Sequence, residues 1–571
     1  MDRCSYVSDE PCKVPSDPDE TTNARELCLR NSDLLEEILG LLSSASDPQE
    51  LESQRQTLLW IALTCKDFLP SAIKFLWRRL DNLLPLLRLL PSFTERGGVY
   101  CLLRPIMPNE WTSFDRHTKH VREIVYDDIP DTIQVEPSVY LRLGLRNSPI
   151  LPNVRRFACS GTTSGPSASE TLLYMQSPLR VLELSSVGSM LNPIPGISME
   201  MTRAMVVSSL REKPSQISHL LLVAQPVTIF DEGIPLGKVT SLEVARINGT
   251  DPALLRRIGS LPHLRSFKAD STCITDLAIR NLAPELSGYT SSQFINSSGG
   301  SLFTELTDLR LNGDLARTDS PVALFLQVIG SDELQCLTLQ KAQTWESLAQ
   351  AMGRGVRSEV PSASILHTIS HRWSKSLRQL DLEVYHSYEA ILELLGALPS
   401  LCSLKMSGDV LRIPVGKSIC SMFAGLSEVG TLSLRCRFYS QEWDPPLSFN
   451  LRSIAILART CPRLRELDIP ISASELPPLR TISLNLRTIT INYSDFVLAD
   501  TLANTIALAR RLDQMFPRLS SLRYDTSSCG RRAVWSAGEA INPSGQVAAW
   551  AQVQELVLAF QDVRRVALAH R

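Results

Sequence analysis

The sequence predicts an α/β solenoid, in which repeated strand-helix units build a parallel sheet, with a small helical domain in front of it. Three observations predict this fold class. A short apolar phrase, loosely L-x-x-L-x-L, recurs fifteen times from about residue 116 onward. Helical patterns lie between many of its copies. A helical segment with a different apolar pattern, Asp33 to Leu80, precedes them all.

The phrase predicts a strand with one dry and one wet side. Its last two apolar residues are two positions apart and therefore point to the same side of a strand, while the residue between them points the opposite way. Eleven of these fifteen middle residues are polar or charged, and four are apolar. The fifteen are Val125, Ala158, Glu183, Leu221, Glu243, Lys268, Arg310, Thr338, Asp381, Lys405, Ser433, Asp468, Thr490, Arg523 and Val557. A doubly wound parallel sheet would be apolar on both faces. A one-sided horseshoe, the leucine-rich repeat solenoid, is expected over residues 116–571.

The segments between the phrases predict one helix per repeat. Examples are Pro252 to Ile258 and Tyr388 to Leu395, each followed by a Leu-Pro pair that favours a helix end and a turn into extended structure. The copies begin 22 to 43 residues apart, so the longer repeats must contain insertions. The Ser- and Gly-rich stretch Ser287 to Ser301 is interpreted as a flexible loop of this kind.

The N-terminal segment predicts three short helices. The first places Leu34, Leu35, Ile38, Leu39 and Leu42 on one face, with Asp33 as its cap and Asn31 or Ser32 as alternative starts. Two further apolar runs follow, from Leu58 to Phe68 and from Ala72 to Leu80. Three helices of this size bury only a small core, so apolar surface left over suggests a partner.

This segment resembles an F-box. Asp33-Leu34-Leu35-Glu36-Glu37-Ile38-Leu39 is similar to the opening helix of the family. Leu63-Thr64-Cys65-Lys66-Asp67-Phe68 is similar to its central signature, and Phe75-Leu76-Trp77-Arg78 to its closing one. The continuation Leu80 to Pro91 resembles a segment that follows the F-box in many basidiomycete fungal proteins. Asn31-Ser32 stands where the family usually has Leu-Pro.

The resemblance implies a substrate-recognition subunit of a cullin-type ubiquitin ligase that catalyses nothing itself. Residues 32 to 80 would dock onto a Skp1-type adaptor through Leu34, Leu35, Ile38, Leu63, Phe68, Leu76 and Trp77. The repeats would hold an unidentified protein substrate on a concave surface lined by Glu183, Glu243, Lys268, Arg310, Asp381, Lys405, Asp468 and Arg523. The alternative is a leucine-rich repeat interaction scaffold whose N-terminal helices only cap the solenoid. The expected domains are a disordered tail (1–24), the F-box-like domain with a linker helix (25–92), a linker (93–115) and the repeats.

Composition limits the function classes further. A net charge of -2 and mixed signs along the middle residues favour a protein partner over nucleic acid. Thirteen cysteines without a C-x-x-C pair indicate free thiols in a cytoplasmic or nuclear protein. Met1 to Glu20 is polar and acidic, and no run of 18 apolar residues occurs, so neither a signal sequence nor a membrane span is expected.

No motif predicts an enzyme, a cofactor or a metal site. His367 and His371 have the i, i+4 spacing of a zinc pair, but the glutamate of H-E-x-x-H and an evident third ligand are lacking. An exposed histidine pair is the interpretation that we favour.

Overall fold

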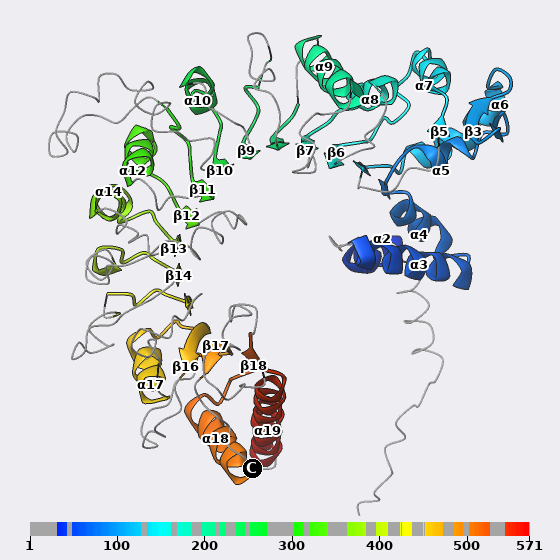
Figure 1. Cartoon of the computed structure of the whole chain (residues 1–571). Coiled ribbons are helices and arrows are strands. Elements are labelled where there is room, and N and C mark those ends of the chain that lie inside the picture. Colours follow the sequence, from blue (N-terminus) through cyan, green and yellow to red (C-terminus); the bar gives the residue numbers. More distant parts are fainter. Residues whose placement is uncertain are drawn as a thin grey trace, which may run out of the picture. The chain divides into compact units, whose positions relative to one another are not determined.

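A computed structural model describes residues 31–42, 48–126, 134–160, 168–185, 197–212, 216–223, 234, 236–245, 252–270, 302–312, 319–340, 363–383, 395–408, 423, 425–436, 449, 451–471, 485–494, 502–525 and 543–569. The expected tail (1–24), the loop Ser287 to Ser301 and all but the last residue of the helix Tyr388 to Leu395 lie outside these residues. The chain forms two compact units, Met1–Gln216 (unit 1) and Ile217–Arg571 (unit 2). Figure 1 shows the elements of both.

Unit 1 begins with three helices: α2 (Ser32–Leu42), α3 (Pro48–Thr64) and α4 (Leu69–Leu76). The side chain of Asn31 caps α2, because its Oδ1 accepts hydrogen bonds from the backbone N–H groups of Asp33 (3.0 Å) and Leu34 (3.4 Å). Of the alternative starts, Asn31 is therefore the one used. Leu39, Leu58, Ala62 and Ala72 form the buried core of the three helices, and Ile61, Phe75 and Leu76 pack against it.

The chain enters the parallel sheet directly after these helices. Strand β1 (Arg79–Leu80) pairs in parallel with β4 (Glu123–Tyr126). The short helix α5 (Leu84–Leu87) follows and brings a buried leucine cluster: Leu83, Leu84, Leu86, Leu87 and Leu90. The segment that resembles the continuation of an F-box is thus built into the first repeat.

Residues 93–115, expected from the sequence to be a linker, are instead ordered structure. Strands β2 (Phe93–Arg96) and β3 (Val99–Leu102) form an antiparallel hairpin, and β5 (Gln134–Val135) pairs with β3. Gly97 and Gly98, at φ +60° and +83°, make the turn, which needs a backbone conformation that favours glycine. Helix α6 (Pro108–Thr118) follows. The glycine pair between β-favouring residues is the hairpin signal in the sequence.

The remainder of unit 1 consists of repeats. Strands β6 (Arg156–Ser160) and β7 (Val181–Ser185) continue the parallel order β1-β4-β6-β7. Helices α7 (Pro137–Gly144), α8 (Ala168–Met175) and α9 (Ile197–Glu212) accompany them. The middle residues Val125 and Ala158 are buried, so the face that is wet in later repeats is covered in the first two.

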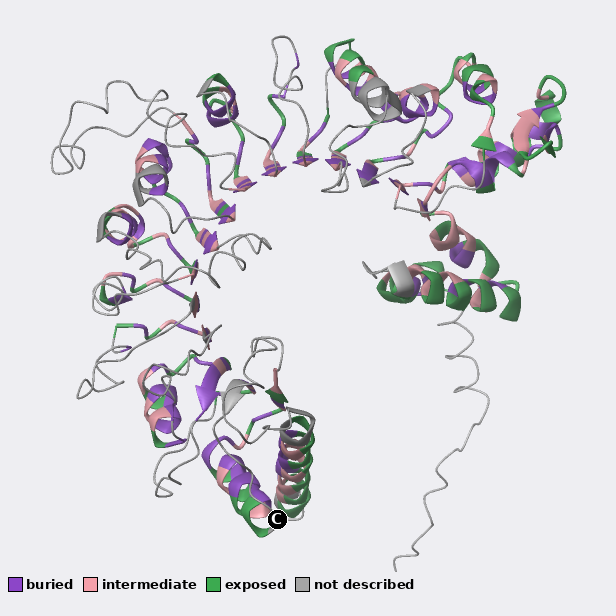
Figure 2. Cartoon of the chain, in the orientation of Figure 1, coloured by how far each residue is buried: buried purple, intermediate pink, exposed green. Residues whose placement is uncertain are grey.

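Unit 2 contributes eleven parallel strands in chain order: β8 (His219–Val223), β9 (Ser241–Ala245), β10 (Ser266–Asp270), β11 (Asp308–Asn312), β12 (Cys336–Gln340), β13 (Gln379–Glu383), β14 (Ser403–Gly408), β15 (Thr431–Cys436), β16 (Glu466–Ile471), β17 (Thr488–Ser494) and β18 (Ser521–Tyr524). Helices α10 (Pro252–Gly259), α12 (Asp319–Val328), α14 (Ala363–Trp373) and α17 (Leu451–Thr460) lie along one side of this series (Figure 1). Figure 2 shows buried residues along the strands and on these helices. The leucine-rich repeat solenoid is therefore the fold of this part of the chain.

Fourteen of the fifteen phrases form strands, namely β4 and β6 to β18. The last phrase, Val553/Leu556/Leu558, was expected to be a strand and lies instead in helix α19 (Pro543–Ala569). Helix α19 packs against α18 (Leu502–Met515), and Gln561 Nε2 donates a 2.9 Å hydrogen bond to the carbonyl of Leu519 just before β18. The final element thus caps the last strand, as the end of a solenoid requires. The fifteenth strand is β1, which no phrase predicted.

Candidate protein-interaction surfaces

Helices α2, α3 and α4 expose a set of large apolar side chains, called here the apolar face. Its members are at least 40% exposed: Leu34, Ile38, Leu41, Leu42, Leu59, Trp60, Leu63 and Leu69. They arise because α2 and α3 are apolar on more than the side that meets their small shared core. Exposed large apolar side chains are typical of interaction surfaces.

The seven side chains expected to serve adaptor binding divide into two groups. Leu34, Ile38 and Leu63 belong to the apolar face, and Leu63 is 70% exposed. The other four are less exposed: Leu35 is buried, Leu76 packs on the helical core, and Phe68 and Trp77 are half-buried, with the ring centres of Trp77 and His117 on α6 4.7 Å apart.

Sequence reasoning missed Leu59 and Trp60, which are 48% and 64% exposed. Both lie in the apolar run that was assigned to one helix without separating its faces. The i, i+4 relation of Leu59 and Leu63 is the signal that places them together.

Several contacts hold the three helices against the first repeat. The guanidinium of Arg55 on α3 forms a two-pronged ion pair with Asp81, at 2.7 and 2.9 Å, and donates to the carbonyl of Arg79 at 3.2 Å. Bidentate pairing of this kind fixes orientation as well as distance. Together with the β1–β4 pairing and the Trp77–His117 contact, it makes the helical domain and the early repeats one body.

The middle residues of the unit 2 strands form a continuous ladder, because adjacent strands are in register. Glu243 is opposite Lys268, Lys268 opposite Arg310, and Asp381 opposite Lys405, with Asp468 and Arg523 flanking Thr490 further along. All seven expected surface residues of unit 2 therefore occupy equivalent positions on one face. Glu183 occupies the same position on β7 in unit 1, opposite Ala158.

Many charges of this ladder are held by neighbours. Lys268 pairs with Glu243 at 2.6 Å, Arg310 with Asp308 at 3.1 Å, and Asp468 with Arg435 at 2.5 Å. Asp381 accepts a 2.9 Å hydrogen bond from Gln340. Lys405 and Arg523 are exposed. A face of mixed charges and polar groups suits hydrogen bonding to a polar protein segment.

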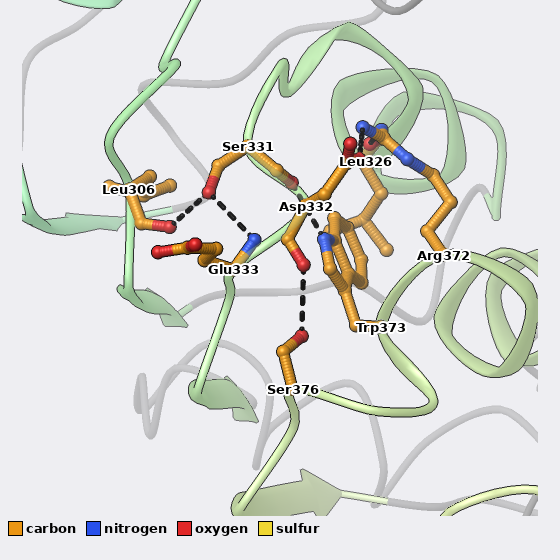
Figure 3. A network of polar contacts seen from close by, with 8 residues as sticks. All are labelled: Leu306, Leu326, Ser331, Asp332, Glu333, Arg372, Trp373 and Ser376. Atoms are coloured by element: carbon orange, nitrogen blue, oxygen red, sulfur yellow. Dashed lines mark hydrogen bonds and ion pairs between the residues drawn. The ribbon is translucent and has the colours of Figure 1, made fainter.

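A polar network joins neighbouring repeats of unit 2 (Figure 3). The buried indole of Trp373 donates its Nε1–H to the carbonyl of Ser331 at 2.8 Å, and the Ser331 hydroxyl donates to the carbonyl of Leu306 at 2.7 Å. Arg372 donates to the carbonyl of Leu326 at 2.9 Å. These bonds satisfy carbonyl groups between the repeats and support the ladder structurally.

A second network is buried in unit 1. The carboxylate of Glu170 on α8 accepts hydrogen bonds from the hydroxyls of Tyr126 and Tyr174, and those hydroxyls are 2.9 Å apart. Burial raises the pKa of Glu170, although the hydroxyl donors oppose this shift. The network joins strand β4 to helix α8, and its role is packing.

The histidine pair His367 and His371 lies on α14 with stacked rings 6.0 Å apart, and both side chains are exposed. Among the described residues, no group of three His, Cys, Asp or Glu side chains is placed to hold a metal ion. No helix in the described part of the chain is long and apolar enough to cross a membrane.

Comparison with known proteins found no matching family model and no matching curated protein. Among solved structures, the chain is similar to the leucine-rich repeat-containing protein LegL7 from Legionella pneumophila, with 14% sequence identity and a TM-score of 0.28. The match covers 66% of this chain and 90% of that one.

Proposed function

We propose that this chain is the substrate-recognition subunit of a Skp1-cullin-F-box ubiquitin ligase. The observation that carries the proposal is the apolar face, because Leu34, Ile38 and Leu63 of the F-box-like motifs are all exposed. An adaptor that covered this face would remove the apolar side chains from water. The adaptor and, through it, the cullin would be the constant partners of this chain. The protein substrate would be the partner that the repeats select.

The attachment of the helices to the first repeat supports this role. Arg55 and Asp81 hold α3 to the chain at β1, so an adaptor bound to the helices would sit at a fixed position relative to the early repeats. A substrate on the repeats would then experience a high effective concentration of the ligase's ubiquitin-loaded enzyme. The chain itself needs no catalytic group for this task. The proposal places it in the cytoplasm or the nucleus.

Adaptor capture with a matched pair of variants tests the proposal. Ile38→Asp with Leu63→Asp puts two charges into the apolar face, whereas Leu141→Asp with Leu145→Asp makes the same change at exposed positions of unit 1 outside it. A purified Skp1-type adaptor should retain the wild-type chain and the second variant. It should lose the first variant, by about tenfold or more in affinity, since buried unpaired charges are costly. Equal retention of both variants, or no retention of the wild type, would refute the proposal.

The alternative is a leucine-rich repeat interaction scaffold with an N-terminal helical cap. The long parallel sheet with its polar row of middle residues favours it, because a solenoid surface can hold a partner without an adaptor. The scaffold needs no adaptor, so the capture experiment separates the two functions.

A further inference from the structure

Four successive strands of unit 1 are each preceded directly by an arginine. These residues are Arg78 before β1, Arg122 before β4, Arg155 before β6 and Arg180 before β7. They are called here the arginine column. None of them belongs to the middle-residue ladder, and the proposed function uses none of them.

Backbone hydrogen bonds set the four arginines side by side. The carbonyl of Arg78 accepts from the N–H groups of Arg122 (2.8 Å) and Glu123 (3.0 Å), and the carbonyl of Arg122 accepts from Arg155 (2.8 Å) and Arg156 (3.1 Å). The carbonyl of Arg155 accepts in the same way from Arg180 at 2.7 Å. Neighbouring members are therefore one strand spacing apart, about 4.8 Å, and the column is roughly 14 Å long.

Three of the four arginines of the column, Arg78, Arg122 and Arg155, have no carboxylate partner among the described residues. The next residue along β6, Arg156, pairs with Glu183 at 2.9 Å and with Glu123 at 3.3 Å. Among the described residues, by contrast, Arg78, Arg122 and Arg155 take part in no ion pair. The guanidinium of Arg78 lies over the ring of Phe75, 5.9 Å from its centre, and Arg122 donates a long, 3.4 Å hydrogen bond to the carbonyl of Lys119.

The local electrostatics agree with a surplus of positive charge. Burial lowers the pKa of Arg122, and repulsion from Arg155 and Arg78 lowers it further. Burial also lowers the pKa of His120, with added repulsion from Lys119 and His117. Arg78 and Arg155 are exposed and Arg122 half-buried, so an anion in solution can reach them. Like charges held in one column repel one another unless an anion covers them.

We propose that the arginine column binds an acidic segment of a protein partner. Guanidinium groups match carboxylates in bidentate geometry. A column of roughly 14 Å suits about four residues of an extended peptide, at ~3.3 Å each. Glu123 and Glu183 stand on the strands beside the column and pair with Arg156, so the unbalanced positive charge is a narrow row that suits one extended segment better than a broad polyanion such as nucleic acid. A single acidic segment avoids these carboxylates, and the site does not depend on adaptor binding.

Direct binding to the full-length chain tests this site. The probe is a fluorescein-labelled twelve-residue peptide of alternating Glu and Ser, measured by anisotropy at low and at raised salt. Arg78→Gln, Arg122→Gln and Arg155→Gln together should weaken binding about tenfold. The matched control is Arg378→Gln, Arg465→Gln and Arg487→Gln, because these residues directly precede β13, β16 and β17 in unit 2. The control should bind within about twofold of the wild type, and wild-type affinity should fall with salt.

Two results would overturn the proposal. One is equal peptide binding by the triple variant and the wild type. The other is a single-stranded oligonucleotide that binds the wild type more tightly than the peptide does and no longer binds the triple variant. That result would assign the column to nucleic acid. Circular dichroism checks folding. If the triple variant does not fold, Arg155→Gln alone, at an exposed position, should weaken peptide binding about twofold to threefold, and unchanged binding would overturn the site.

Discussion

Single side chains decide how the small N-terminal domain is built. Asn31 stands where the F-box family usually has Leu-Pro, and its Oδ1 caps α2. The departure from the motif therefore has a structural role of its own, since capping asparagine satisfies N–H groups that the helix leaves unpaired. Trp77, expected at the adaptor surface, is half-buried and its ring contacts that of His117. The same motif residues thus serve both the domain's surface and its attachment to the repeats.

Glu170 predicts a pH-dependent difference in stability at the residue scale. Its pKa in the folded chain is raised above the ordinary value of 4.5, so the folded chain binds this proton more readily than the unfolded chain. The stability that this proton contributes is fully present below about pH 4.5 and is lost as the pH rises through the raised pKa. Glutamine does not titrate. The unfolding temperature of Glu170→Gln minus that of the wild type should therefore increase by a few degrees from pH 5 to pH 8.

Differential scanning calorimetry at several pH values measures this difference. Glu555→Gln, on the exposed side of α19, removes the same charge at the surface and should follow the wild type. A Glu170→Gln difference that shrinks as the pH rises would contradict the prediction.

Whether a segment forms a strand or a helix depends on the apolar surface that it must cover. The last phrase reads as a strand from Val553, Leu556 and Leu558, yet Trp550, Val553, Val557 and Gln561 are the buried residues, at helical spacing. A strand there would need another repeat to cover it, whereas helix α19 covers the end of the sheet itself. Arg564 pairs with Asp513 and holds α19 to α18.

The end of helix α10 gives a prediction at the element scale. A Cβ at Gly259 would lie 2.8 Å from Cε2 of Phe303 and 2.9 Å from Cβ of Leu302, so Gly259→Ala should destabilise the chain by about 1–3 kcal/mol. Gly396→Ala is the control, because a Cβ there meets nothing within 4 Å. Thermal unfolding of both variants measures the effect. If Gly396→Ala unfolds at a lower temperature than Gly259→Ala, the prediction that Phe303 and Leu302 leave no room for a side chain at Gly259 is wrong.

At the scale of the whole molecule, the N-terminal helices continue into the repeats without the linker that the sequence predicted. Residues 93–115 form the hairpin and most of α6, and unit 1 extends to Gln216. The N-terminal helices, the leucine cluster and the first repeats therefore belong to one compact unit.

Two N-terminal truncations test whether the repeats begin at β1. Removing residues 1–76 takes away α2 to α4 but leaves β1 and the leucine cluster, so the repeats should remain soluble and folded. Removing residues 1–92 also removes β1 and Leu83, Leu86, Leu87 and Leu90, which are all buried, and it exposes the edge of β4. That chain should aggregate. Size-exclusion chromatography compares the two, and equally soluble truncations would contradict the boundary at β1.

The sequence by itself determined the repeat fold and most of its strands, because an apolar period of two is a local property that each strand carries wherever it lies. It also placed Lys268, Arg310 and their equivalents on one face. Only the tertiary structure decided which of Leu34, Leu35, Ile38 and Trp77 are exposed, since three helices divide their apolar residues between core and surface by packing. The arginine column was equally hidden. Its members are 44, 33 and 25 residues apart in the sequence, with no common period, and the pairing of strands brings them together.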